Sequence, residues 1–451
     1  MNTLETKSIL AFAASVMSLA ANATVPAVTS CTMEQPSNAR AVTITYTLDN
    51  APAVVTLDVQ TNRTGAATAS EADWISIGGE AVSNAKGDVW KKVGTSGTFN
   101  GTITWRPDQS WPGHKIENNS ARAVVTAWSL DNTPDYMVVD ISAAAQQNTQ
   151  NYYPAVEFLP GGLLGNPDYR TTSLVMRKIM AKDVKWTMGS TTMEPNRNAS
   201  REATHKVTLT NNYYIGVFPV TQTQWSLVAS NSGAKGYFTM EPSMRPMESI
   251  SFNELRNTHS ATPGKDVIVA AGSGGVWPDA PTSDSFLGLL RLKSGIDFDL
   301  PSEAQWEFAA RAGNGDTKWC DGSTITMAGN DPALNLLGRY KYNGGLIGDS
   351  EPANSCGVTN GTAIVGSYAP NSWGLYDTLG NVSEWCLDYG KDDISALNGA
   401  VNTATSTYKI FRGGQWSYIA SDCRPAYRTG TAPENRRIGV GARVVCTAGL
   451  Q

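Results

Sequence analysis

The chain has 451 residues, a length that suits two domains. Its hydrophobic content of 41% and charged content of 17% exclude a chain that is disordered throughout. The 35 basic and 40 acidic residues give a net charge of −5 and form no basic run. A nucleic-acid partner is therefore not expected, because affinity for nucleic acid comes mainly from clustered Lys and Arg facing phosphate.

The N-terminus has the features of a secretory signal. Lys7 precedes an apolar run over 9–20, and Ala21-Asn22-Ala23 fits a small-x-small cleavage site. The run is too short for a membrane span, and no later run is long and apolar enough to be one. We predict a signal peptide over 1–23 that is cleaved near Ala23, and a secreted, periplasmic or cell-surface protein.

Residues 24–145 carry a β pattern. Apolar and polar residues alternate in runs that are separated by turn residues, which predicts an antiparallel sandwich of the immunoglobulin or fibronectin type. No cluster of chemistry-bearing side chains lies in this part, so we expect a spacer or adhesion module. The expected strands are Val42–Tyr46, Val55–Val59, Gly101–Trp105 and Tyr136–Ile141.

A linker is predicted over 146–170. Residues 143–151 are polar and lack hydrophobic periodicity, and the stretch that follows them is rich in Gly and Pro. The second domain is expected over 171–447, and it begins with short strands. These are expected at Ser173–Ile179, Trp186–Ser190, His205–Leu209 and Tyr213–Val217.

Two capping boxes mark helix starts in the second domain. Thr221 with Gln224, and Ser302 with Gln305, each place a hydroxyl and an amide where they satisfy free backbone N–H groups. A third helix is expected over Asp284–Lys293, with its apolar side chains on the buried side. Short helices, short strands and much loop together predict an α+β class for this domain.

Several motifs follow one another in a fixed order across the second domain. They are Tyr214–Gln222, Arg245–Glu248, Leu300–Glu307, Trp373–Asp377, Gly380–Trp385 and Arg412–Gly414. With these motifs the chain resembles the formylglycine-generating enzyme (sulfatase-modifying factor) family over residues 171–446. The resemblance implies a variant of the C-type lectin fold.

Enzymes of this family oxidise a sulfatase cysteine to formylglycine with copper held by a pair of cysteine thiolates, soft ligands that suit Cu(I). The resemblance places this pair shortly after the two glycines. Counted forward from Gly413-Gly414, Cys423 falls near the second position and Tyr418 takes the first. Counted back from Arg428, Cys423 matches neither position. The pair is missing in both alignments, so copper is not expected.

Cys423 is the catalytic candidate only if the protein is an enzyme. The C-terminal part contains no histidine that could act as its base. A disulfide with Cys386, or a buried and unreactive thiol, is the better expectation, since the chain has 6 cysteines and an even number permits disulfides in an exported protein. No C-x-x-C occurs, and a zinc site is not expected.

The resemblance also implies a structural calcium ion in the loop over 377–384. Asp377 and Glu384 would supply carboxylate oxygens, and Gly380 and Val382 would supply backbone carbonyls. Hard oxygen ligands of this kind suit Ca²⁺. The alternative is that the two carboxylates cap turns and pair with arginines.

Aromatic and small polar residues lie between the framework residues of the segment 412–433. The mixture resembles an antibody paratope, in which Tyr and Trp dominate the contacts. It also resembles the variable region of diversity-generating retroelement proteins, which display changeable residues on the same fold. The displayed residues are Trp416, Ser417, Tyr418, Ile419, Ser421, Asp422, Tyr427, Thr429 and Thr431.

Two hypotheses of function follow. The first is a non-catalytic protein that binds a protein or cell-surface ligand through the displayed residues. The second is a copper-dependent formylglycine-generating oxidase that acts on sulfatase cysteines. An ordinary loop surface with buried aromatic side chains is a further interpretation of the same residues.

Overall fold

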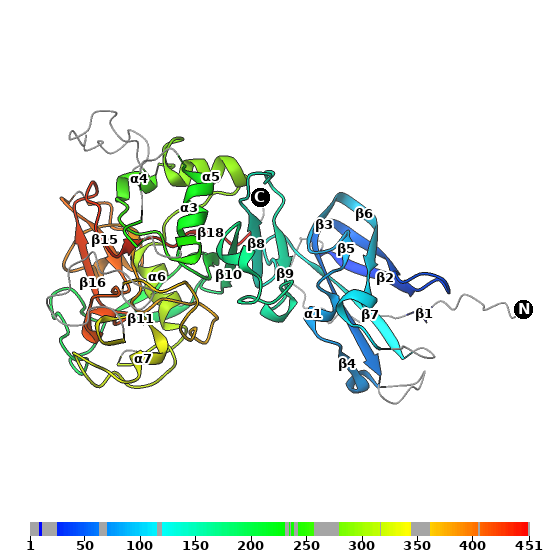
Figure 1. Ribbon diagram of the computed structural model, residues 1–451, viewed down its shortest axis with the longest axis horizontal. Helices are drawn as coiled ribbons and strands as arrows, with labels where there is room; N and C mark the ends of the chain where they lie inside the picture. The colour runs from blue at the N-terminus through cyan, green and yellow to red at the C-terminus, as the bar shows by residue number, and fades with distance from the viewer. Residues whose placement is uncertain are drawn as a thin grey trace, which may run out of the picture. The chain divides into compact units, whose positions relative to one another are not determined.

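The computed structural model describes residues 9–10, 25–62, 70–114, 120–230, 234, 236–238, 242–256, 279–315, 317–343, 361–404 and 406–449. The chain divides into two units (Figure 1). Unit 1 comprises Met1–Val138, Gln150–Pro167 and Ala448–Gln451, and unit 2 comprises Val139–Thr149 and Asp168–Thr447. The predicted signal peptide over 1–23 lies outside the described residues except for Ile9–Leu10.

Unit 1 is organised around one long strand, β3 (Val42–Asn62). The antiparallel partners of β3 are β2 (Ala27–Glu34), β4 (Trp74–Ser76), β6 (Lys91–Trp105) and β7 (Ala121–Trp128). At the margins of this network, β1 (Ile9–Leu10) pairs with β2, and β5 (Lys86–Gly87) pairs with β6. The described helices of the unit are short: η1 (Glu71–Asp73), α1 (Gly79–Val82), α2 (Pro107–Ser110) and η2 (Val156–Phe158).

The runs Val42–Tyr46 and Val55–Val59, predicted as separate strands, are both parts of β3. At Asn50 φ is +60°, and the β3–β6 register shifts between Leu48 and Ala53. The polar residues between the two runs therefore form a bulge, and they do not reverse the chain. The prediction of two strands was wrong here. The immunoglobulin or fibronectin strand order stays a prediction.

Part of the stretch predicted as a linker over 146–170 is folded into unit 1. Strand β9 (Asn151–Tyr153) pairs antiparallel with the first residues of β8 (Tyr136–Asp140). The ring centroids of Tyr153 and Trp90 lie 5.2 Å apart, and Leu159 is fully buried. These few large apolar side chains anchor a segment that has no hydrophobic periodicity.

Unit 2 combines small sheets with short helices. β13 (Tyr213–Gly216) pairs antiparallel with β10 (Ser173–Ile179) on one side and β18 (Val445–Thr447) on the other. β11 (Lys185–Met188) pairs with β12 (His205–Thr208). In a further sheet β15 (Lys409–Arg412) lies between β14 (Ser383–Tyr389) and β16 (Arg428–Thr431), and β17 (Val440–Gly441) runs parallel to β14.

Both predicted capping boxes form. The hydroxyl of Thr221 accepts the N–H of Gln224 at 3.2 Å, and the hydroxyl of Ser302 accepts the N–H of Gln305 at 3.1 Å. The α-helices described in unit 2 are α3 (Gln222–Val228), α4 (Phe252–Arg256), α5 (Phe286–Ser294), α6 (Glu303–Arg311) and α7 (Leu334–Leu337). Single turns of 3-10 helix are η3 (Pro167–Arg170), η4 (Pro242–Met244), η5 (Lys341–Asn343), η6 (Ser395–Leu397) and η7 (Ala420–Cys423).

Within the described ranges, none of the helices combines the length and the apolar character that a bilayer crossing requires.

Candidate functional site

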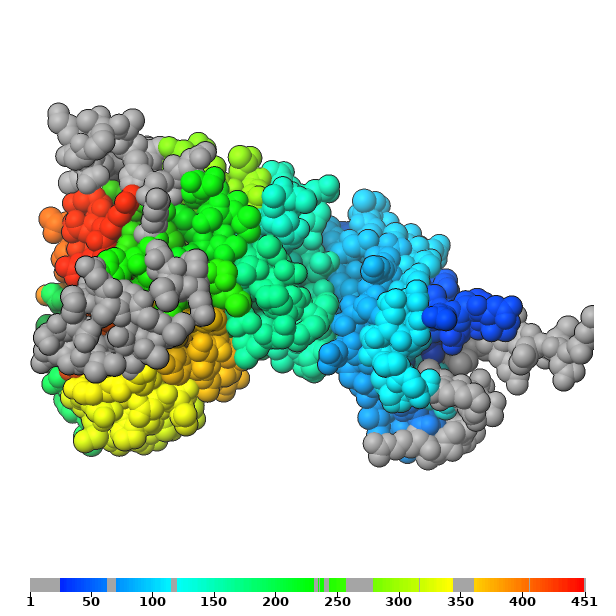
Figure 2. All heavy atoms as spheres, in the orientation of Figure 1, coloured from blue at the N-terminus to red at the C-terminus, as the bar shows by residue number. Residues whose placement is uncertain are grey.

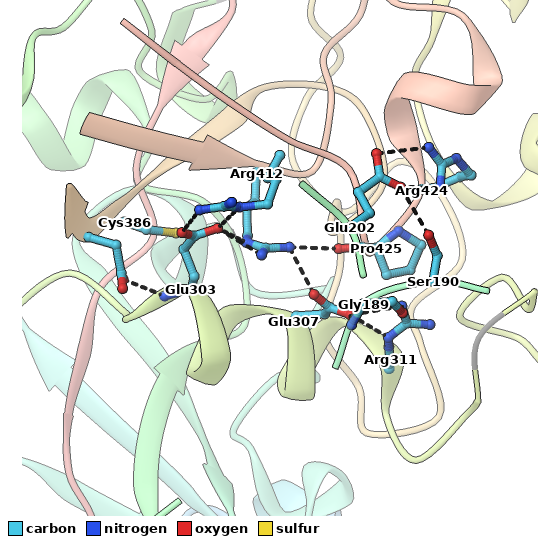
Figure 3. A network of polar contacts seen from close by, with 12 residues as sticks. Gly189, Ser190, Glu202, Glu303, Glu307, Arg311, Cys386, Arg412, Arg424 and Pro425 are labelled. Atoms are coloured by element: carbon cyan, nitrogen blue, oxygen red, sulfur yellow. Dashed lines mark hydrogen bonds and ion pairs between the residues drawn. The ribbon is translucent and has the colours of Figure 1, made fainter. Parts of the chain in front are cut away.

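Helix α6 carries a pair of buried carboxylates toward the sheet of β14, β15 and β16 (Figure 3). Glu303 and Glu307 are four residues apart, so both side chains lie on one face of the helix. At the end of β15, Arg412 donates from Nε to Glu303 at 2.9 Å and from Nη1 to Glu307 at 2.9 Å. Each of these three side chains is at most 2% exposed. The pairs hold α6 against β15.

Further arginines surround the same two carboxylates. Arg428, at the start of β16, donates from Nε to Glu303 at 2.6 Å, and Arg311 donates from Nε to Glu307 at 2.8 Å. The backbone N–H of Gly189 donates to Glu307 as well, at 2.9 Å. Charge-assisted hydrogen bonds of this kind are the strong ones, and they offset the cost of removing the charges from water.

A second buried group ties the N-terminal part of unit 2 to the segment after η7. Arg424 donates from Nη1 to Glu202 at 2.7 Å and also contacts Glu194. A third group joins Arg443 to Glu384, with Nη2 2.8 Å from Oε1, while the indole N–H of Trp306 donates to the same carboxylate at 2.6 Å. The motif residues Glu303, Trp306, Glu307, Glu384 and Arg412 are therefore framework, and they hold the loops in place.

The residues predicted to hold calcium do not fit that ion. Both oxygens of Glu384 already accept hydrogen bonds from the guanidinium of Arg443, and a cation there would have to displace another cation. Asp377 accepts the backbone N–H of Gly366 at 2.7 Å and the amide of Asn381 at 3.1 Å. Burial raises the pKa of Asp377 to about 6, which is above the ordinary pKa of an aspartate side chain. The alternative stated from the sequence, turn capping and pairing with arginine, describes these contacts.

The Gly413-Gly414 turn positions the segment that follows it. Both glycines have positive φ, +96° and +69°, where side chains are strained. A Cβ at Gly414 would lie 2.5 Å from the backbone oxygen of Asp422 and 2.7 Å from Sγ of Cys423. The chain therefore returns onto the turn, and η7 is packed directly against it.

Cys423 is a buried thiol. It belongs to a core cluster with Trp319, Cys320 and Leu379, and burial raises its pKa far above the ordinary value. Cys386 lies in a different cluster, with Trp306 and Ala310. Of the two alternatives stated for Cys423, the structure shows the buried thiol and not the disulfide with Cys386.

Each cysteine in the described part of the chain is a free thiol. The remaining one, Cys356, lies outside the described residues.

Three of the nine displayed residues predicted from the sequence are buried. Trp416 is 8% exposed and packs edge-on against Phe238, with ring centroids 5.0 Å apart. Ser421 is fully buried and Thr431 is 9% exposed. Their assignment as ligand contacts is corrected: they belong to the supporting structure. The sequence offered no signal for this, because Phe238 is far from Trp416 along the chain.

The other six residues are partly exposed, and we call them the display face. The rings of Tyr418 and Tyr427 meet edge-on at a centroid distance of 6.2 Å. The face comprises Ser417, Tyr418, Ile419, Asp422, Tyr427 and Thr429.

A second segment, missed by the sequence interpretation, supports this face. The backbone N–H of Lys341 donates to the carbonyl of Tyr418 at 2.9 Å, and the N–H groups of Ala420 and Ser421 donate to carbonyls of residues 329 and 328, also at 2.9 Å. Near these contacts Met327 is 53% and Tyr342 is 49% exposed. Figure 2 shows the segment 317–343, in yellow, as a continuous part of the surface of unit 2.

Unit 2 is thus a loop-rich α+β domain whose interior is held together by buried Arg–Glu pairs. A family model described as "Sulfatase-modifying factor enzyme 1-like domain" matches residues 176–448. The match covers more than half of the chain, and the chain therefore belongs to this family. The family resemblance drawn from the ordered motifs is confirmed, and with it the C-type-lectin-like fold of this part.

Relatives with different names share the domain. The formylglycine-generating enzyme of Thermomonospora curvata is 32% identical over 155 residues, which are 32% of this chain and 48% of the relative. The serine/threonine-protein kinase pkn1 of Chlamydia pneumoniae is 34% identical over 134 residues, or 29% of this chain and 18% of the relative. The chain thus spans about half the length, or less, of these relatives.

Among solved structures, Treponema denticola variable protein 1 is 22% identical with a TM-score of 0.42, and the match covers 61% of this chain and 96% of that one.

Proposed function

We propose that unit 2 is a non-catalytic binding domain that holds a protein or cell-surface ligand on the display face. The observation that carries the proposal is the contrast between two sets of residues. The charged motif residues Glu307 and Arg412 are paired with each other in the interior, and Cys423 is enclosed. Tyr418, Asp422 and Tyr427, in contrast, reach the surface. Partly exposed tyrosines on a rigid support are favourable contact residues, because they offer large area at low entropic cost.

The proposal includes export and diversification. A ligand on a cell surface is accessible to this chain only if residues 1–23 act as the signal that their sequence predicts. Diversification at the display face would require a reverse transcriptase and a near-repeat of the coding segment close to the gene. A genome with adjacent sulfatase genes and without that arrangement would count against this part of the proposal.

The test is selection of binding peptides. A random peptide library displayed on phage is selected on the purified full chain, and enriched peptides are measured against a variant with Tyr418→Ala, Asp422→Ala and Tyr427→Ala. We expect these substitutions to weaken binding at least about tenfold, since truncation of central aromatic contacts costs more than 1 kcal/mol.

The matched control removes exposed apolar side chains elsewhere on unit 2. Met180 is 56% and Leu292 is 66% exposed, and Met180→Ala with Leu292→Ala should leave peptide binding unchanged. Enriched peptides that bind the triple variant as well as the wild type would overturn the display face as the binding site. The failure to enrich any peptide would also count against it.

The second candidate is a formylglycine-generating oxidase. It is favoured by the 32% identity to an enzyme of that name over 155 residues. In this chain Cys423 would have to bind copper alone, from inside a closed apolar cluster. A peptide with the sequence Cys-x-Pro-x-Arg is incubated with the copper-loaded chain and oxygen, and the product is followed by mass spectrometry. Formation of formylglycine that is lost in Cys423→Ala would establish the oxidase and overturn the binding proposal.

A further inference from the structure

We propose that the ligand of the display face is a protein, and that an apolar patch of this protein also covers Tyr342 and Met327 beside that face. This inference rests on the proposed binding function, and it specifies the extent of the surface and the class of the ligand. Both residues lie outside the segment 412–433 that holds the displayed residues. They are therefore fixed contacts next to the displayed ones.

Main-chain hydrogen bonds place both residues beside the display face. The N–H of the residue before Tyr342 donates to the carbonyl of Tyr418 at 2.9 Å. The carbonyl of the residue after Met327 accepts the N–H of Ser421, also at 2.9 Å. Each of the two side chains is thus one position away from a residue that is bonded to the segment carrying the display face.

The ring of Tyr342 reaches from one supporting turn to the other. Its hydroxyl lies 3.7 Å from the point where a Cβ of Gly329 would stand, and the carbonyl of Gly329 accepts the N–H of Ala420 at 2.9 Å. The ring centroids of Tyr342 and Tyr340 lie 5.9 Å apart. Tyr340 belongs to the core cluster against which Tyr418 packs. Tyr342 is nevertheless 49% exposed, so a partner can cover it.

Side-chain hydrogen bonds fix both turns. The carboxylate of Asp331, which is 1% exposed, accepts the N–H of Met327 at 3.2 Å. The side chain of Asn343 accepts the N–H of Tyr340 at 2.8 Å and donates to the carbonyl of Gly338 at 2.6 Å. A partner therefore meets anchors whose main chain is already ordered, and binding costs less conformational entropy.

The chemistry of the two anchors favours a protein ligand. Tyr and Met are among the residue types that are enriched in protein–protein interfaces. The unbranched side chain of Met327 is 53% exposed and can adapt to different apolar surfaces, which suits partners that change with the displayed residues. A glycan would find only a weak hydrogen-bond acceptor in the thioether. A protein with an apolar patch is therefore the ligand that these contacts fit.

Hydroxyl-radical footprinting tests the surface without changing the chain. The phage-selected peptides are bound to the full chain, and the oxidation of individual Met and Tyr side chains is followed by mass spectrometry. We expect bound peptide to slow the oxidation of Met327 and Tyr342 severalfold, because oxidation follows exposure. Met180, which is 56% exposed elsewhere on unit 2, is the internal control and should oxidise at the same rate with and without peptide.

Substitutions measure the contribution of each anchor. Tyr342→Ala should weaken the selected peptides by about 5- to 30-fold and Met327→Ala by about 2- to 5-fold, as expected for a major and a minor contact. Tyr342→Phe keeps the ring and should retain most of the affinity. Met180→Ala removes a methionine of similar exposure and should change nothing. Thermal melting shows whether each variant is folded, and the footprint of the wild type does not depend on the variants.

Unchanged oxidation of Met327 and Tyr342 in the presence of bound peptide would overturn the extended surface, whatever the variants show. If the same peptides lose affinity for the triple variant at Tyr418, Asp422 and Tyr427, the display face stands and only its extension is wrong. If no selected peptide depends on either set of residues, both proposals fail together. A glycan-array ligand that is lost in Tyr342→Ala, in the absence of such peptides, would assign the surface to a glycan and overturn the protein partner.

Discussion

Arg412 reaches Glu307 across 105 positions of sequence, and its Nη1 atom lies 2.9 Å from Oε2 of the carboxylate. The same guanidinium also binds Glu303, so one side chain joins both acidic residues of α6 to the end of β15. All three groups are buried. The interior of this loop-rich domain is thus held by a few buried side chains that are joined by charge-assisted hydrogen bonds.

The first prediction concerns this pair. Glu307→Gln should lower the free energy of unfolding by about 3–5 kcal/mol, because it leaves buried guanidinium groups without their charge partner. Guanidinium chloride unfolding followed by tryptophan fluorescence measures the change. The control is Asp392→Asn, which breaks the exposed pair with Arg201 and should cost about 1 kcal/mol or less. Equal losses in the two variants would contradict the structural role of the network.

The second prediction concerns the reactivity of Cys423. Its thiol is enclosed and has a raised pKa, so alkylation by iodoacetamide at pH 8 should be at least about 100-fold slower than in guanidinium chloride. Peptide mass spectrometry resolves the individual cysteines. Cys31 is only partly buried and should react faster in the folded chain. Rapid labelling of Cys423 in the native protein would show that the site is open.

The third prediction compares two glycines. Gly414→Ala places a methyl group against the backbone of residues 422 and 423 at positive φ, and we expect a loss of at least about 1–2 kcal/mol of stability together with reduced peptide binding. A Cβ at Gly315 would meet nothing within 4 Å, so Gly315→Ala should be neutral. Thermal melting and the peptide assay are measured on both variants. An unaffected Gly414→Ala protein would mean that the segment does not pack as described.

The fourth prediction is a pH dependence due to Lys409. Burial lowers the pKa of this amine to about 7, and its Nζ donates to the carbonyl of Leu387 at 2.7 Å. Between pH 7 and 10 the unfolded chain holds a proton that the folded chain has released, so the free energy of unfolding should rise with pH. The charges of Asp388 and Asp299 oppose the lowering, and that of Arg256 adds to it.

In Lys409→Met the free energy of unfolding should no longer rise with pH over this range. Urea unfolding midpoints at pH 7, 8 and 9 measure the change. Lys206→Met is the matched control, since this lysine is exposed on β12 and bonds the hydroxyl of Thr187 at 2.7 Å. An unchanged slope in Lys409→Met would show that the amine is not the titrating group.

The fifth prediction concerns metal removal. The guanidinium of Arg443 already pairs with the carboxylate of Glu384, so we expect no calcium there. Dialysis against EDTA should leave the melting temperature of the full chain unchanged. Elemental analysis should find no stoichiometric calcium retained by residues 377–384. One calcium per chain that disappears in Glu384→Gln would restore the prediction made from the family resemblance.

Local signals in the sequence were sufficient for the short elements of unit 2. The capping boxes at Thr221 and Ser302 fixed the starts of α3 and α6, because each box is made within four residues. The strand predicted at Ser173–Ile179 is β10, with the same bounds. The continuous β3 was missed because Asn50 and its neighbours are typical of a turn, and only pairing with β6 makes them a bulge.

The site was less predictable than the fold. Tyr418 and Tyr427 could be selected by residue type, but burial of Trp416 depends on Phe238, and support of the face depends on residues 328–341. Such contacts join segments that are distant along the chain, and they produce no periodic pattern in the sequence. The alternative interpretation of Glu384 as an arginine partner also needed the position of Arg443.

The internal location of the Arg–Glu pairs has a consequence for how the gene can change. Codons for Ser417, Tyr418 and Ile419 specify side chains that none of these buried pairs uses. Randomising them would leave the buried pairs intact and change what the face recognises, while at Tyr418 each new side chain would also have to pack against the cluster of Trp319 and Cys423. The same exchange at Glu303 or Arg412 would be eliminated by misfolding before any recognition could be selected.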